Sequence, residues 1–324
     1  MVISKTPFRM SFFGGGTDIP SYFNLNRGAV ISTTFNKYCY VTLRVLPPFF
    51  SYTDELVYSK IERITKDQVF EHPMVRNALA FTHLRNLRIS YEADLPARSG
   101  LGTSSSFAVG LLNALHVLKN EKVTKRQLAE EAIYVEREMC KEAGGWQDQI
   151  AAAYGGFNKI SFTNNSFSVI PLNISEERLK KIENNLFLYF TGFTRISSEI
   201  QKNNIKCSDT KIWNDLLSLV EEAEKFLVND NIPVDYLGKL LHETWIIKKS
   251  SSHVVSNKYI DSLYDYARKS GALGGKLLGA GSGGFLLFYV PECYQRGFLE
   301  KMQKNLHIPF KFENSGSQII YDGD

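Results

Sequence analysis

The stretch that decides the fold is Pro96-Ala97-Arg98-Ser99-Gly100-Leu101-Gly102-Thr103-Ser104-Ser105-Ser106, which lies between a predicted strand and a predicted helix. Glycines let backbone N–H groups approach an anion closely, and the unpaired N–H groups that begin a helix attract negative charge. The hydroxyl groups can cap the helix or bind a metal ion. Alone, the segment fits a plain helix cap and a phosphate-binding loop equally well. It is not a Walker loop, because no Gly-Lys-Ser/Thr follows at the required spacing.

A second glycine-rich segment, Gly14-Gly15-Gly16-Thr17-Asp18, follows an apolar strand that carries Arg9. Three glycines leave room for a ligand against the backbone, and Asp18 can accept hydrogen bonds from two hydroxyl groups. An Asp after a Thr is also a common turn cap. This segment alone favours the cap.

A third segment, Gly279-Ala280-Gly281-Ser282-Gly283-Gly284, formally matches the dinucleotide pattern GxGxxG. The apolar run at 285–290 follows it and is a predicted strand, whereas a dinucleotide site needs a helix there. We therefore interpret the segment as a tight loop that approaches a ligand. A purely structural turn is the alternative.

The remaining pattern mixes strands and helices. Ala29–Leu46 alternates with a period of two and is the clearest strand. Further strands are expected at Val2–Met10, Leu87–Ala93, Leu186–Phe190, Leu286–Val290 and Gln318–Tyr321. Helices are expected from Pro73 to about Leu87, from the first glycine-rich stretch to about Lys119, from the capping box at Thr124 to about Lys141, at Trp146–Tyr154, and near 209–228, 233–249 and 257–270. We expect charged Ser175–Asn185 to link two halves of an α+β fold.

Composition narrows the class of protein. The 324 residues are 44% hydrophobic and 22% charged, as in an ordinary globular protein. Four scattered cysteines favour a reducing, cytoplasmic compartment, and neither they nor the six histidines have metal-ligand spacing. A net charge of +4 is too weak for a nucleic-acid binder. Residues 1–11 contain no apolar core of signal-peptide length, so we expect no signal peptide, and no apolar run is long enough to span a membrane. No partner beyond a small molecule, and no oligomeric state, is predicted.

The three glycine-rich segments resemble, in order and spacing, the three motifs of the GHMP kinase superfamily, which includes galactokinases, homoserine kinases and mevalonate kinases. Motif one is the segment 6–18, motif two is 96–106 and motif three is 276–285. Gly145-Trp146-Gln147-Asp148-Gln149 is similar to the segment that carries the catalytic Asp in galactokinases. The resemblance covers nearly the whole chain. It implies an N-terminal ribosomal-protein-S5-like lobe at 1–175 and a C-terminal ferredoxin-like lobe at 176–324.

The resemblance also implies ATP and Mg²⁺ as cofactors and assigns roles. Asp148 would take the proton of the attacking hydroxyl, and Arg9 would keep Asp148 ionised and stabilise the transferring group. Glu136, at the family's spacing from Asp148, would bind Mg²⁺ together with Ser104. The ATP phosphates would be bound by Arg98, Ser99, Gly100, Leu101, Gly102, Thr103, Ser104 and Ser105. Arg98 occupies a place usually held by Gly, so it is either strained or a further phosphate contact.

The residues found in motif one indicate a class of substrate. Galactokinases carry Glu-His where this chain has Gly15-Gly16, and the form found here resembles D-glycero-D-manno-heptose 7-phosphate kinases. These enzymes phosphorylate the anomeric hydroxyl on the route to nucleotide-activated heptoses. Gly15, Gly16, Asp18 and Gly281 would face the sugar, and Arg195 would bind its distal phosphate, with Lys248 and Lys249 as weaker candidates. The alternatives are a kinase of fucose, galactose or non-phosphorylated heptose, and a non-catalytic sugar sensor.

Overall fold

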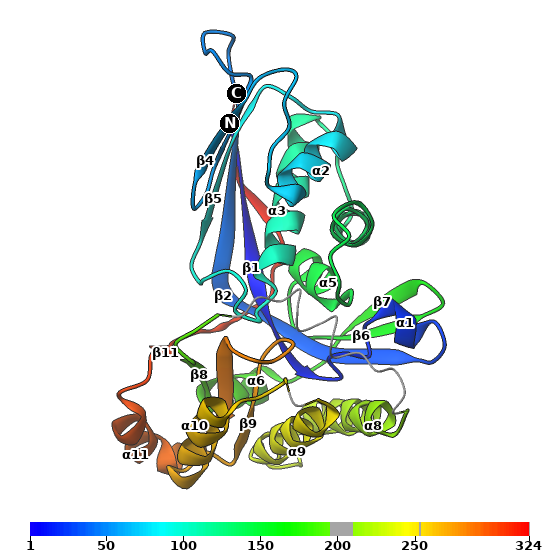
Figure 1. Ribbon diagram of the computed structural model, residues 1–324. Helices are drawn as coiled ribbons and strands as arrows, with labels where there is room; N and C mark the ends of the chain where they lie inside the picture. Colours follow the sequence, from blue (N-terminus) through cyan, green and yellow to red (C-terminus); the bar gives the residue numbers. More distant parts are fainter. Residues whose placement is uncertain (195–209, 253, 324) are drawn as a thin grey trace.

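The computed structural model describes residues 1–194, 210–252 and 254–323, and it has an elongated, two-part shape with both chain ends at the far tip of one part (Figure 1). A nine-stranded sheet forms most of that part. Its main path runs β13-β1-β2-β5-β3-β4, while β6 and β12 also pair with β2, and β7 pairs with β6. The strands are β1 (Val2–Phe13), β2 (Gly28–Val45), β3 (Asp54–Val57), β4 (Ile61–Ile64), β5 (Leu87–Ala93), β6 (Asn158–Thr163), β7 (Ser166–Pro171), β12 (Phe312–Glu313) and β13 (Gln318–Asp322).

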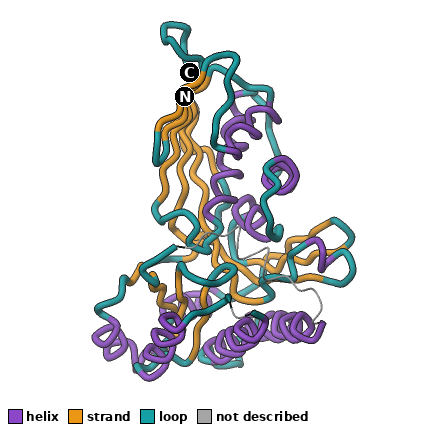
Figure 2. Tube along the Cα trace, viewed as in Figure 1, coloured by secondary structure: helices purple, strands orange, loops and turns teal. Residues whose placement is uncertain are grey.

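Helices cover one face of this sheet (Figure 2). They are α2 (Pro73–Thr82), α3 (Thr103–Leu118), α4 (Lys125–Ile133), the π-helix η1 (Tyr134–Met139) and α5 (Gln147–Tyr154). Most residues of α3 are buried, because this helix lies between the sheet and the other helices. Residues 103–112 of α3 are apolar or small and suit that position.

The second part is built on a four-stranded antiparallel sheet in the order β11-β8-β10-β9. These strands are β11 (His307–Ile308), β8 (Leu186–Phe190), β10 (Phe285–Tyr289) and β9 (Gly274–Leu277). The accompanying helices are α6 (Glu176–Asn184), α8 (Thr210–Leu227), α9 (Tyr236–Ser251), α10 (Lys258–Lys269) and α11 (Glu292–Met302), while the short α1 (Pro20–Phe23) follows β1. Helix α8 contacts β1 and β2 as well as α9, so it bridges the two parts.

The predicted strands and most predicted helices are confirmed within a few residues. One prediction is wrong. Helix α2 ends at Thr82, because His83 and Asn86 adopt left-handed backbone conformations that end the helix before β5. Segment 175–185 connects β7 of the first sheet to β8 of the second, and it contains α6, which Ser175 caps by accepting a hydrogen bond from Arg178 N–H.

The C-terminal tail returns to the first sheet. Strand β13 pairs with β1 and β12 pairs with β2, and the ammonium group of Met1 donates to the carbonyl of Gly323. The predicted division into 1–175 and 176–324 stays a prediction. It separates the two sheets except for this tail, which crosses back.

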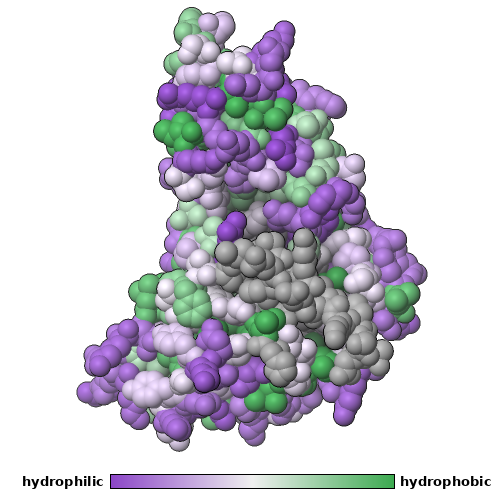
Figure 3. Space-filling view, viewed as in Figure 1, coloured by the Kyte–Doolittle hydropathy of each residue, from purple (hydrophilic) through white to green (hydrophobic). Residues whose placement is uncertain are grey.

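The visible surface is largely hydrophilic at both ends, with hydrophobic side chains in small groups (Figure 3). Across the described ranges, no helix has the length and apolar character that crossing a bilayer would require.

Candidate active site

The glycine-rich loops of motifs two and three touch backbone to backbone where the two parts of the molecule meet. A Cβ atom on Gly100 would lie 2.5 Å from the carbonyl oxygen of Leu278, and one on Gly284 would lie 2.0 Å from that of Ser99. No side chain fits at either glycine without displacing backbone. The loops therefore form one continuous wall beside the site.

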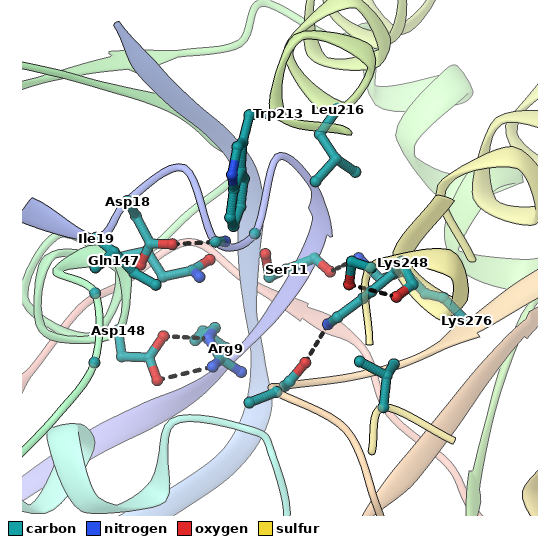
Figure 4. Close-up of a pocket in the computed structure, with 18 of the residues that line it drawn as sticks. Arg9, Ser11, Asp18, Ile19, Gln147, Asp148, Trp213, Leu216, Lys248 and Lys276 are labelled. Carbon is teal, nitrogen blue, oxygen red and sulfur yellow. Dashed lines mark hydrogen bonds and ion pairs between the residues drawn. The ribbon is translucent and has the colours of Figure 1, made fainter. Parts of the chain in front are cut away.

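Arg9 and Asp148 form an ion pair at the centre of the site (Figure 4). Arg9 Nε donates to Asp148 Oδ1 at 2.7 Å, and Nη2 donates to Oδ2 at 2.8 Å. The remaining nitrogen, Nη1, donates to the carbonyl oxygen of Gly100 at 2.6 Å. Strand β1 positions Arg9, and the first turn of α5 positions Asp148. Two of the residues predicted to act together are thus in direct contact.

A pocket opens beside this pair. Arg9, Asp148, Gly15, Gly16 and Asp18 line it, together with side chains of α8, α9 and motif three. Four of these five come from β1 and the loop that follows it. The structure therefore brings together one group of the predicted site residues in one cavity.

Asp18 lies at the edge of the pocket and is almost fully buried. Its Oδ1 accepts from Gly16 N–H at 2.9 Å and its Oδ2 accepts from Gln147 N–H at 3.2 Å. Burial, followed by the nearby Asp148 carboxylate, raises the pKa of Asp18, while these two N–H groups lower it. Asp18 thus joins the motif-one loop to the start of α5, in addition to facing the pocket.

Two lysines lie on the opposite side of the pocket (Figure 4). Lys276 is buried and donates to the carbonyl oxygens of Ser11 at 2.9 Å and Phe12 at 2.7 Å. Burial, followed by the charges of Lys248 and Arg9, lowers the pKa of Lys276 well below its usual range, which favours its neutral amine. Lys248 donates to the carbonyl of Gly279. The positive charge that suits an anionic reactant is therefore that of Lys248 and Arg9 rather than that of Lys276.

Glu136 lies in the π-helix, a distortion that is frequent at functional sites. Its buried carboxylate accepts from Ser105 Oγ at 2.8 Å and from the Gln149 amide. The hydroxyl beside Glu136 is therefore that of Ser105, whereas Ser104 is exposed. This geometry does not test the predicted metal ligand Ser104.

A magnesium ion suits this donor set. Within the described ranges, no group of three or more His, Cys, Asp or Glu residues is arranged to hold a metal ion. Mg²⁺ does not need such a cage, because it usually binds through one or two carboxylates, substrate phosphates and water. One buried carboxylate beside hydroxyl groups, at the mouth of a phosphate-type loop, fits that preference.

The predicted phosphate loop leads directly to the Arg9–Asp148 pair. Gly102 precedes the first turn of α3 with φ = 74°, and its Cβ position lies 3.2 Å from Arg9 Cγ and 3.5 Å from the Asp148 carboxylate. Helix α3 therefore begins beside the ion pair. The left-handed φ of 59° at Arg98 makes it strained relative to Gly, and its side chain is exposed. Ser99 Oγ is buried and has no hydrogen-bond partner among the described residues.

One predicted substrate residue, Gly281, does not line the pocket, and another cannot be placed. The position of Gly281 is explained by packing, because its Cβ would lie 2.7 Å from the Val255 backbone, and the neighbouring Gly279 and Ala280 line the pocket instead. Arg195 lies outside the described residues.

The pocket residues that sequence reasoning missed include Ser11, Gln147 and Trp213. Ser11 is a polar residue within the apolar end of β1, and this break in the apolar pattern is visible in the sequence. Gln147 directly precedes Asp148, so its place in the same sequence segment could have identified it. Trp213 lies on amphipathic α8, where an aromatic residue is typical of a core.

Comparisons with known proteins match both parts of the chain to kinase families. The model for the GHMP kinases N terminal domain matches residues 68–156, and the model for the GHMP kinases C terminal matches residues 230–306.

Three relatives illustrate the similarity. The D-glycero-alpha-D-manno-heptose 7-phosphate kinase of Campylobacter jejuni is 31% identical over 93% of each chain. The bifunctional fucokinase/GDP-fucose pyrophosphorylase of Arabidopsis thaliana is 28% identical over 72% of this chain and 23% of its own length. The crystal structure of a D-glycero-D-manno-heptose 1-phosphate kinase from Bacteroides thetaiotaomicron superposes with a TM-score of 0.83 at 24% identity, covering 100% of both chains, and so supports the fold.

Proposed function

Since the chain belongs to the GHMP kinase family and is an ATP-dependent kinase that acts on a sugar, we propose that its substrate is D-glycero-D-manno-heptose 7-phosphate. The proposed reaction transfers the γ-phosphoryl group of ATP to the anomeric hydroxyl. The observation that carries the proposal is the similarity, along nearly the whole chain, to a heptose 7-phosphate kinase.

We propose that Asp148 accepts the proton of the anomeric hydroxyl as that oxygen attacks phosphorus. Each Asp148 oxygen already accepts one hydrogen bond from Arg9, and each keeps a lone pair for the substrate. Arg9 balances the carboxylate charge before the reaction and the developing phosphoryl charge during it. The start of α3, beside both residues, is the proposed site of the β- and γ-phosphates.

Mg²⁺ is the proposed second cofactor, with Glu136 and a serine at the start of α3 as its protein ligands. When bound, the ion would neutralise charge on the ATP phosphates. Ser104 is the predicted ligand. Ser105 is the hydroxyl that contacts Glu136, so its role is to position that carboxylate.

The sugar end of the pocket has space where galactokinases carry two polar side chains. Gly15 and Gly16 line it without side chains. The room that this leaves for a seven-carbon substrate lies beside Gly15, because the Trp213 ring occupies the space at the Cβ position of Gly16. Arg195 remains the predicted partner of the distal phosphate. Among the described residues, Lys248 and Arg137 also line the pocket. Arg137 donates to the carbonyl oxygen of Gly145 at 2.9 Å, which fixes the loop before α5.

A fucose kinase is the second candidate, because a fucokinase also matches most of this chain. A sensor without catalysis is less well supported, since sugar sensing requires neither the Arg9–Asp148 pair nor buried Glu136.

The test is ATP consumption with a panel of hexoses, heptoses and their terminal phosphates. The proposal predicts the highest kcat/KM on the heptose 7-phosphate and a product without a free reducing end. A product that still reduces a tetrazolium reagent would contradict transfer to the anomeric position. A preference for fucose would favour the second candidate.

A further inference from the structure

We propose that Ser11 and Gln147 form a hydroxyl-binding pair that selects the sugar, an inference that rests on the proposed assignment of this pocket to the sugar substrate. Both residues line the pocket and lie beside Gly15. It would recognise one hydroxyl group of the substrate that is not the hydroxyl phosphorylated.

The Ser11 side chain supplies the first observation. Ser11 is 5% exposed, lines the pocket, and its Oγ has no hydrogen-bond partner among the described residues. Its backbone carbonyl is fixed by Lys276 Nζ at 2.9 Å, so the residue is held in place while its hydroxyl is unused. Buried hydroxyl groups are nearly always hydrogen-bonded in folded proteins, so this one needs a partner.

Gln147 supplies the second observation. It is 8% exposed, lines the same pocket, and its Oε1 is also without a partner in the described part of the chain. Its backbone N–H is held by Asp18 Oδ2 at 3.2 Å. The backbone is therefore fixed while the buried amide oxygen is left to a ligand (Figure 4).

Gly15 brings the two groups to one place. A Cβ atom on Gly15 would lie 3.5 Å from Ser11 Oγ and 3.7 Å from Gln147 Nε2, which belongs to the same amide as the unpartnered Oε1, and no third atom of the described residues lies within 4 Å. Both polar groups thus border the space that a side chain at Gly15 would occupy. The next glycine is different, because Trp213 from α8 lies over Gly16, only 2.6 Å from its Cβ position. The pair therefore borders the pocket at Gly15, and the indole ring lies beside the next residue.

A sugar hydroxyl matches this pair. One hydroxyl group can bond to the serine hydroxyl and to the glutamine amide at the same time, donating to one and accepting from the other. An analogue with hydrogen in place of that hydroxyl would leave two buried polar groups unpaired, which is the situation that gives hydrogen-bonding sites strong selectivity. The pair therefore acts as a specificity determinant rather than as a catalytic group.

The test compares kcat/KM of the wild-type enzyme and of its variants on the sugar substrate and on its deoxy analogues. The wild-type enzyme is first assayed on the sugar panel, and monodeoxy analogues of its best substrate are then compared with that substrate. We expect one analogue to lose about 10- to 100-fold in kcat/KM with the wild-type enzyme. In the variant S11A/Q147M that loss should fall to about threefold or less, mainly through the KM for the sugar, with the KM for ATP unchanged.

Two further variants separate recognition from folding. Ser32 lies opposite Ser11 on β2 and has a buried, unpartnered hydroxyl too, but it does not line the pocket. S32A should leave the sugar KM unchanged. Gly15 has no left-handed φ and its Cβ would make only ordinary van der Waals contacts with described residues, so G15A should keep the wild-type Tm while raising the sugar KM about tenfold or more.

The outcomes distinguish this inference from the proposed function. Undiminished discrimination in S11A/Q147M, or a sugar KM for G15A equal to that of the wild type, would overturn the hydroxyl-binding pair. A wild-type preference for a sugar other than the heptose 7-phosphate would overturn the proposed substrate. It would not overturn the hydroxyl-binding pair, because the comparison of variants with deoxy analogues uses whichever sugar the wild-type enzyme prefers.

Discussion

Arg9 and Asp148 are 139 positions apart and meet through two parallel hydrogen bonds of 2.7 and 2.8 Å. The same guanidinium donates to Gly100. One side chain thus joins strand β1, helix α5 and the predicted phosphate loop. Bidentate pairing of Arg with a carboxylate fixes orientation as well as charge. The carboxylate is therefore held in place for the reaction rather than recruited by the substrate.

We predict that Asp148→Asn lowers kcat about 10²- to 10⁴-fold, because an amide cannot accept the substrate proton. ATP·Mg²⁺ binding, measured by titration calorimetry, should remain close to that of the wild type. The control is Asp67→Asn, which makes the same chemical change in an exposed loop and should leave kcat unaltered. If the Asp148 variant keeps more than about a third of the wild-type kcat with saturating sugar, it is not the base.

A second prediction concerns Mg²⁺. Glu136→Gln and Ser104→Ala should each raise the Mg²⁺ concentration for half-maximal rate about tenfold or more, and their combination should be strongly non-additive because both groups serve one ion. Ser105→Ala is the informative comparison, since Ser105 donates to Glu136 at 2.8 Å. It should raise the Mg²⁺ requirement less than Ser104→Ala does. A larger effect at Ser105 would transfer the ligand role to that hydroxyl.

The order of the main strands and helices could be predicted because it depends on local patterns. The two-residue alternation of β2 and the glycine-rich start of α3 are both visible in the sequence. The short strands β3, β4, β9, β11 and β12 were not predicted, since strands of two to four residues carry too little pattern. The six-residue strands β6 and β7 were not predicted either. Their formation depends on partners far away, as β12 shows by pairing with β2.

The site residues that could be predicted from the sequence are those that lie within recognisable motifs. Arg9, Asp148 and Asp18 lie in recognisable segments and line one pocket. Trp213 reaches the pocket only because α8 packs across β1 and β2, which no local pattern specifies. The contact of Glu136 with Ser105 rather than Ser104 depends on the rotation of α3 about its axis, and that rotation is set by packing.

A third prediction uses pH. His116 is buried between Glu131, whose Oε2 lies 2.5 Å from Nε2, and Glu121, whose Oε2 lies 2.7 Å from Nδ1. The hydrogen bond to Glu131 is the main cause that raises the pKa of His116, and Glu121 adds to it, against the opposing effect of burial. The folded state therefore favours the protonated imidazole.

The sign of the stability change follows from that direction. The His116 contribution is complete below the unfolded-state pKa of about 6.5 and is lost as pH rises through the raised folded-state value. We expect His116→Gln to reduce the free energy of unfolding by about 1 kcal/mol at pH 5.5, and by progressively less above pH 7. Urea unfolding across this range tests it, with exposed His83→Asn as the control. A deficit that grows with pH would contradict the assignment.

The last prediction separates strain from charge at Arg98. Its φ of 59° is costly for any residue with a Cβ, so Arg98→Gly should be more stable than Arg98→Ala by about 1 kcal/mol. Both variants lose the same guanidinium, so any contact with the ATP phosphates disappears equally from both. If that contact exists, both should raise the KM for ATP about tenfold, and Arg98→Lys should recover part of the loss. Thermal unfolding and ATP-dependent kinetics on the three variants give the two effects independently. Equal stability of the Gly and Ala variants would show that the left-handed conformation carries no cost here. An unchanged KM for ATP in all three would remove Arg98 from the phosphate site and leave it as a strained but exposed residue of the loop.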